Sequence, residues 1–132
     1  MSALRDDVKG RIDAIEKSYE YLLAYAAQGL PSDVGSKSGG QLREYLSKAV
    51  SAIDGLADAL TGLAQEEALE PAEQWSDVLD VIARDASDTL AAVRLVSAQA
   101  SVSSQLIDNL NANIHLRALL TDLFLVDELI GT

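Results

Sequence analysis

The chain has 132 residues, of which 48% are hydrophobic, and it carries a formal net charge of -11 with no cysteine. This length suits one globular core, so we expect residues 1–132 to form a single domain. The absence of cysteine excludes disulfides, zinc–thiolate sites, iron–sulfur clusters and thiol nucleophiles. The excess of acidic residues argues against nucleic-acid binding, which depends on lysine and arginine side chains at the phosphates.

Two further features favour a cytoplasmic protein with no membrane partner. Asp6 and Asp7 stand where a signal peptide would need an apolar run. The most apolar stretch, residues 114–130, contains several charged and polar side chains and is too polar for a membrane span.

Apolar residues recur every three or four positions, a spacing that predicts an all-α fold. The first helix is expected over residues 3–28 and ends before Pro31, which cannot continue it. The second, over residues 39–65, contains an unbroken apolar heptad. Ser38 and Gln41 have the spacing of a capping box at its start.

Two more helices complete the expected fold. The third is expected over residues 71–97, with Pro71 as its first residue. A serine-rich stretch then separates it from a fourth helix over residues 104–130, for which Ser103 is the expected N-cap. One continuous helix from residue 71 to residue 130 would be about 90 Å long, too long for a compact domain to cover. Four segments of similar length predict an antiparallel up-and-down four-helix bundle.

The residue inventory predicts neither a cofactor nor a metal site. His115 is the single histidine, so the paired Glu-x-x-His motifs of di-iron bundles and bis-histidine haem ligation are excluded. The glycines do not form a phosphate-binding loop. We therefore expect a non-enzymatic protein without catalytic residues.

An alternative function depends on His115. Asp108, Asn111, His115 and Asp122 fall within about 60° of one another on a continuous helix. Histidine phosphotransfer domains are also four-helix bundles of this size with one exposed histidine, and carboxylates around His115 would raise its pKa. This chain lacks their His-x-x-Lys-Gly pattern. The same polar residues are also consistent with an ordinary solvated helix face.

Small residues form a line on the second expected helix. It includes Gly55 and Gly62, one heptad apart, at a cost of about 1 kcal/mol each relative to alanine. The line indicates close approach of another helix, either within the bundle or from a second subunit.

Tyrosine positions suggest a partner surface. Tyr21 and Tyr25 form an i,i+4 pair away from the apolar stripe of the first helix. Exposed tyrosines often serve as interface anchors, although scattered exposed aromatic residues are also common.

The last expected helix is apolar around most of its circumference, more than one bundle interior can cover. We therefore expect self-association, with a dimer as the first hypothesis, through Leu120, Phe124 and Ile130. The leading functional hypothesis is a self-associating interaction or regulatory accessory protein, which could also bind a further protein partner. Phosphotransfer or ligand binding at His115 is the alternative. A small apolar ligand between the helices is a third possibility.

Overall fold

The computed structural model describes residues 2–131, and the described chain is all-helical, as the sequence predicts, with six helices and no strand. The helices are α1 (Ala3–Ala27), α2 (Lys37–Ile53), α3 (Leu56–Glu66), α4 (Ala72–Ser97), α5 (Ser104–Asn111) and α6 (Ile114–Ile130). The first and third expected helices match α1 and α4 closely. The second and fourth are each divided in two, so the prediction of uninterrupted helices over residues 39–65 and 104–130 is wrong.

An arginine from another helix bonds to the backbone at the break between α2 and α3. Gly55 takes the left-handed conformation, with φ of 85°, which glycine adopts without steric cost. The Arg11 guanidinium of α1 donates to the carbonyl oxygens of Ser51, Ala52 and Asp54 at 3.2, 3.1 and 2.6 Å. Carbonyls at a helix end lack partners within the helix, and they favour a nearby positive charge. Arg11 therefore stabilises the end of α2.

The break between α5 and α6 has a local cause. Asn113 takes an extended conformation, and its side-chain oxygen accepts hydrogen bonds from the backbone N–H groups of His115 and Leu116. This is N-capping, which satisfies donors that the first helical turn leaves unpaired. The last segment consequently starts a new helix at Ile114.

Other helix ends follow the sequence more closely. Ser103 caps α5 by accepting from the Leu106 N–H at 3.0 Å, which confirms the predicted cap. Ser36, rather than Ser38, caps α2, so the predicted capping box is wrong by two residues. Pro71 immediately precedes the first residue of α4 instead of being that residue.

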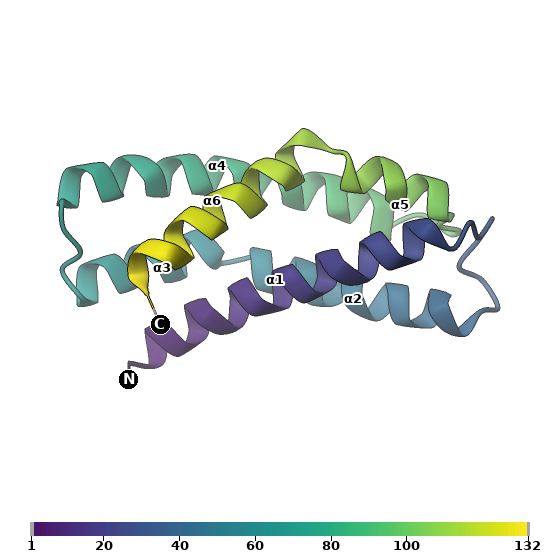
Figure 1. Cartoon of the computed structure of the whole chain (residues 1–132), viewed down its shortest axis with the longest axis horizontal. Helices are drawn as coiled ribbons and strands as arrows, with labels where there is room; N and C mark the ends of the chain where they lie inside the picture. The colour runs from purple at the N-terminus through teal and green to yellow at the C-terminus, as the bar shows by residue number, and fades with distance from the viewer. Residues whose placement is uncertain (1, 132) are drawn as a thin grey trace.

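The helices run back and forth along one long axis (Figure 1). α1 crosses the molecule, α2 and α3 return beside it, α4 crosses again, and α5 and α6 return. α1 packs against α2, α3 and α5, while α4 packs against α2, α3 and α6. The start of α1 and the end of α6 meet at the same end, where Arg5 donates to the Ile130 carbonyl at 2.9 Å.

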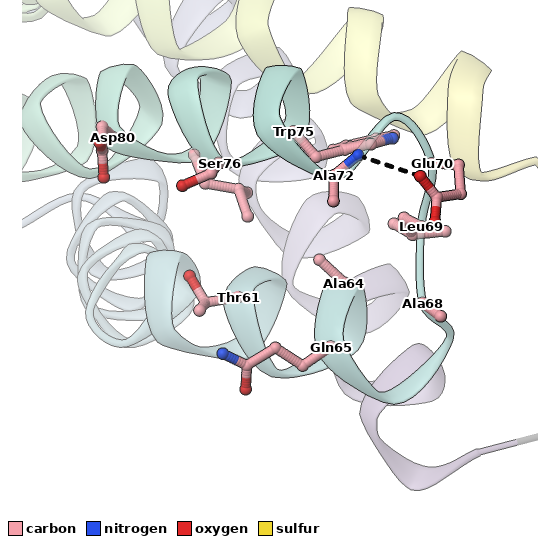
Figure 2. Close-up of a pocket in the computed structure, with 11 residues that line it drawn as sticks. Thr61, Ala64, Gln65, Ala68, Leu69, Glu70, Ala72, Trp75, Ser76 and Asp80 are labelled. Carbon is pink, nitrogen blue, oxygen red and sulfur yellow. Dashed lines mark hydrogen bonds between the residues drawn. The ribbon is translucent and has the colours of Figure 1, made fainter.

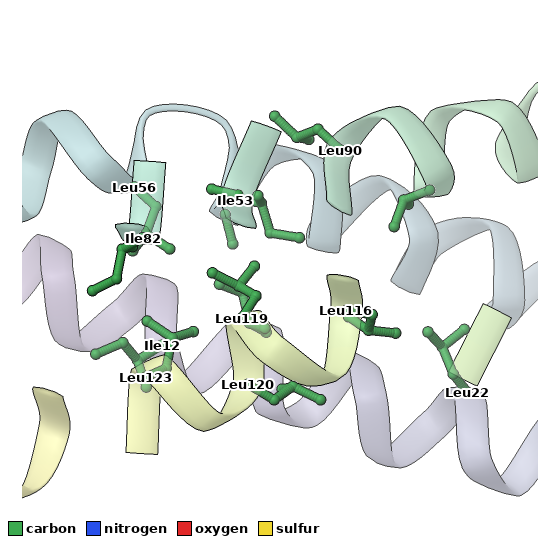
Figure 3. Packing of buried hydrophobic residues seen from close by; sticks show 14 of the residues in the cluster. Ile12, Leu22, Ile53, Leu56, Ile82, Leu90, Leu116, Leu119, Leu120 and Leu123 are labelled. Atoms are coloured by element: carbon green, nitrogen blue, oxygen red, sulfur yellow. The ribbon is translucent and has the colours of Figure 1, made fainter. Parts of the chain in front are cut away.

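A continuous hydrophobic core fills the space between these helices. Leu119 and Leu123 of α6 lie among apolar side chains from four other helices, including Ile12, Ile53 and Ile82 (Figure 3). The α6 residues on the opposite side of the helix from this inner face are exposed to solvent.

At the opposite end, a half-buried ion pair joins two loops. Asp33, which lies before α2, accepts from Arg43 at 2.8 Å and from the Val102 N–H at 2.6 Å. Arg43 also donates to the Ser97 and Gln99 carbonyls, both at 2.8 Å. The hydrogen bond from Arg43 is the main reason why the pKa of Asp33 lies below its ordinary value.

Among the described residues, no helix combines the length and the apolarity that crossing a membrane would require.

Candidate functional site

The strongest candidate site is the solvent-facing side of the last helix. We define the α6 outer face as its seven exposed residues: Ile114, Arg117, Thr121, Phe124, Leu125, Glu128 and Leu129. Their spacing places all seven on one side of the helix, opposite the inner face that packs in the core. Four of the seven are large apolar side chains.

The exposure of these apolar side chains is high. Ile114 is 74% exposed, Leu129 62%, Phe124 57% and Leu125 54%. Single exposed apolar residues are normal, whereas a contiguous group marks a contact surface on a soluble protein. The sequence-based expectation of surplus apolar residues in this segment is therefore confirmed for the α6 outer face.

Two hollows flank the α6 outer face. One, of about 480 Å³, lies on the α1 side and is lined by Tyr19, Ile114, Arg117 and Phe124, among others. The other, of about 170 Å³, lies on the α4 side and is lined mostly by apolar side chains, including Trp75, Val78, Leu125 and Leu129. A side chain of a helix docked on the α6 outer face could insert into either of these two hollows.

Several residues predicted for self-association lie elsewhere. Leu120 and Ile130 are buried in the core, so their prediction as contact residues is wrong, and of the three apolar residues named only Phe124 is exposed. An added Cβ at Gly62 would lie 3.4 Å from the Leu4 side chain. The missing side chain at Gly62 therefore allows close packing of α1 from the same chain. Gly55 forms the break between α2 and α3, close to the Arg11 guanidinium.

The two tyrosines do not form an exposed pair on α1. Tyr25 is fully buried, and its hydroxyl donates to the Val102 carbonyl at 2.7 Å, so the prediction that it is exposed is wrong. Tyr21 is half-buried and stacks on Tyr45, with ring centroids 4.5 Å apart. Its hydroxyl donates to the Ser38 carbonyl. Both side chains fasten α1 to other parts of the same chain.

The four polar residues grouped around His115 do not share one helix face, because the break at Asn113 separates Asp108 and Asn111 on α5 from His115 and Asp122 on α6. Asp108 is exposed on α5. Asn111 is buried, and its Nδ2 donates to the Leu22 carbonyl at 3.1 Å. The nearest carboxylate to the half-exposed His115 ring is Asp88 of α4, whose Oδ2 lies 3.6 Å from Nδ1.

Asp122 faces α4 and meets a second carboxyl group there. Burial, followed by a hydrogen bond and the charge of Asp85, raises the pKa of Asp122 to about 7. The Oδ2 atom of Asp122 is buried and accepts no hydrogen bond from an N–H or O–H group of the described chain. A hydrogen bond between two carboxyl groups requires a proton on one of them, so this pair favours keeping a proton to a higher pH than a free carboxyl group does.

Sequence reasoning counted Leu125 and Leu129 among the surplus apolar residues without selecting them as contact residues, and it missed Asp85 in the carboxyl pair. The helical angle of 100° per residue sets both leucines apart from Leu119 and Leu123, so a periodicity count restricted to residues 114–130 could have found them. Asp85 had no such signal, because its partner lies on another helix.

Within residues 2–131, no group of three or more histidine and acidic side chains is placed to hold a metal ion. Comparison of the chain with protein-family models, curated proteins and solved structures finds no match.

Proposed function

We propose that the chain is a non-enzymatic helical interaction protein that self-associates through the α6 outer face, with a dimer as the simplest assembly. The observation that carries this proposal is the concentration of four exposed apolar side chains on one helix. Burying one such side chain contributes about 1.5–3 kcal/mol. Four of them, together with the two flanking hollows, provide the centre of an interface.

The pattern along α6 favours a second copy of the chain as the occupant. Arg117 lies in the first half of the α6 outer face and Glu128 in the second half. If two copies of α6 pack antiparallel about a two-fold axis near residue 122, Arg117 of each copy approaches Glu128 of the other. Ile114 then approaches Leu129. A face that complements itself in this way suits a symmetric dimer.

The arrangement of the six helices supports the same proposal. We infer that they act as an antiparallel up-and-down four-helix bundle in which α2 with α3, and α5 with α6, each serve as one broken segment. In such a bundle every segment has one inner face, so the apolar outer face of α6 has no partner within residues 2–131. A cytoplasmic setting fits the cysteine-free composition.

Sedimentation of a Phe124→Asp variant tests self-association. The change removes an apolar anchor and adds a negative charge at the proposed interface, so the dimer dissociation constant should rise roughly 30-fold or more. Leu95→Asp is the matched control, because Leu95 is 67% exposed near the opposite end of α4 from the flanking hollow. A wild-type chain that sediments as a monomer at high concentration would exclude the proposal.

A charge exchange tests the antiparallel geometry separately. Glu128→Arg should weaken self-association, because two Arg117 side chains would then face two new arginines. Arg117→Glu combined with Glu128→Arg should restore it. If the double variant is as weak as Glu128→Arg alone, the proposed antiparallel pairing is wrong even when Phe124→Asp has its expected effect.

The alternative function at His115 has one supporting contact. The half-exposed ring lies beside Asp88, and such a carboxylate can orient an imidazole for phosphoryl transfer. Incubating the protein with acetyl phosphate, followed by mass spectrometry, tests this alternative. Phosphorylation that His115→Ala abolishes would favour it over a purely structural protein.

A further inference from the structure

The turn between α3 and α4 borders a hollow of about 340 Å³, which shares Glu70 and Trp75 with the smaller hollow beside the α6 outer face. Its wall combines residues of α3, of the turn and of the first turns of α4 (Figure 2). The volume lies within the range of small-molecule sites. The hollow is therefore large enough for a small organic ligand.

The wall of the hollow combines apolar and polar side chains, with an aromatic side chain on the α4 side. Ala64, Leu69, Ala72 and Leu79 supply apolar surface, and Trp75 adds its half-buried indole. The face of an indole attracts cations as well as alkyl groups. A ligand with an alkyl body and a positive charge matches this lining.

Two carboxylates stand at opposite ends of the hollow. Glu70 lies at the turn and Asp80 at the far end, as Figure 2 shows. The Glu70 carboxylate lies beside the Ala72 N–H, so its separation from Asp80 along α4 is approximated by the rise of the helix from Ala72 to Asp80. That rise is about 12 Å at 1.5 Å per residue. Glu70 accepts a hydrogen bond from the Ala72 N–H at 3.3 Å, which holds it beside the hollow.

No positively charged side chain in the described part of the chain pairs with these two carboxylates. The described lining includes no lysine, arginine or histidine. Within residues 2–131, neither Glu70 nor Asp80 forms an ion pair. An anionic ligand would be repelled, whereas a ligand with two positive charges about 12 Å apart would meet a carboxylate at each end.

We propose that the hollow between α3 and α4 binds a linear aliphatic diamine or polyamine, with its ammonium groups at Glu70 and Asp80 and its alkyl chain across Trp75. The ligand does not require self-association. The interface proposal and this one can therefore fail independently.

Trp75 is the single tryptophan of the chain and lines the hollow, so its fluorescence responds to a ligand bound there. Titration with diaminooctane or spermidine should give a saturable change in emission. Octanediol has the same length without charge, and Mg²⁺ has charge without an alkyl chain, so neither should give a saturable change. The titration is done in Phe124→Asp protein, so that association near Trp75 does not alter the same signal.

Paired carboxylate variants locate the binding. Glu70→Gln and Asp80→Asn should each raise the diaminooctane dissociation constant about five-fold, the upper range for a solvent-accessible ion pair. Glu73→Gln and Asp77→Asn remove the same charge from exposed positions of α4 outside the hollow, and they should leave the constant unchanged. Circular dichroism verifies that each variant is folded.

Three results would overturn the proposal. The first is the absence of a saturable change with either amine. The second is an equal response to octanediol or Mg²⁺, which would show that alkyl length or charge alone is sufficient. The third is an equal loss of affinity in the control variants, which would show general attraction to an acidic protein. The comparison of diaminooctane with octanediol needs no carboxylate variant and remains decisive if any of these misfolds.

Discussion

Asp122 shows how a single carboxyl group can make folding depend on pH. Its buried Oδ2 and the adjacent Asp85 carboxyl favour the protonated form in the folded chain, where the pKa is about 7. In the unfolded chain Asp122 returns to its ordinary pKa of 3.8. Between these two values the folded state binds one more proton than the unfolded state does.

This difference predicts that stability decreases as pH rises. The free energy of unfolding contributed by Asp122 should be greatest below its unfolded pKa, decrease between pH 4 and 7, and level off above about pH 7. Asp122→Asn removes the titration while retaining the side-chain shape. Its urea midpoint should exceed that of the wild type at about pH 8 and approach it at about pH 5. The exposed Asp108→Asn should instead follow the wild-type pH profile; equal profiles for all three proteins would contradict the prediction.

Tyr25 shows a limit of sequence reasoning at the same scale. Its polar hydroxyl and its place beside the apolar stripe of α1 suggest exposure. The structure buries it because the Val102 carbonyl accepts its hydrogen at 2.7 Å, which offsets the cost of removing the hydroxyl from water. That partner lies 77 residues away in sequence. No local pattern could have indicated it.

At the scale of helices, periodicity predicted where helices exist but not where they break. Ile53 and Leu56 are three positions apart and both buried, so the apolar heptad continues across the break between α2 and α3. The break combines a local feature, the left-handed Gly55, with Arg11, which lies on another helix and bonds three carbonyls. At Asn113, by contrast, the capping side chain was a local signal that the long apolar pattern obscured.

Arg11→Ala tests how much this contact contributes. The change leaves the carbonyls at the end of α2 without their charged donor, so we expect the free energy of unfolding to decrease by about 2 kcal/mol. Lys17→Ala removes a cation from the exposed side of the same helix and should cost less than about 0.5 kcal/mol. Urea denaturation of the two variants measures the difference. Similar losses in both would mean that Arg11 contributes no more than a surface cation.

The candidate site was only partly predictable for a related reason. The sequence identifies α6 as too apolar for one buried face and includes Phe124 in the surplus. Which half of the helix is covered depends on how α1 and α4 pack against it. Leu120 and Ile130 consequently lie inside, while Leu125 and Leu129 lie outside.

At the scale of the whole molecule, net charge opposes the proposed self-association. Each copy carries -11, and residues 67–132 hold 11 of the acidic groups but only 3 basic ones. Two such molecules repel each other at long range. The apolar α6 outer face has to overcome this repulsion, whereas an exposed Arg117–Glu128 contact would contribute at most about 1 kcal/mol.

Salt should therefore strengthen the dimer. Raising the ionic strength from about 0.1 M to about 1 M shortens the screening length from about 10 Å to about 3 Å, which weakens the repulsion between copies. We expect the dissociation constant from sedimentation to decrease several-fold. A dimer that weakens with salt would indicate that ion pairs, rather than apolar contact, hold the copies together.

The hydrogen bonds that join α1 to the last third of the chain also affect its biosynthesis. Asn111 and Ser104 both bond to backbone carbonyls of α1, at Leu22 and Tyr25. Residues 3–27 leave the ribosome well before these partners, so α1 has no α5 to pack against while the rest of the chain is made. A chain interrupted after α4 would leave one apolar side of its first helix open to chaperones and proteases.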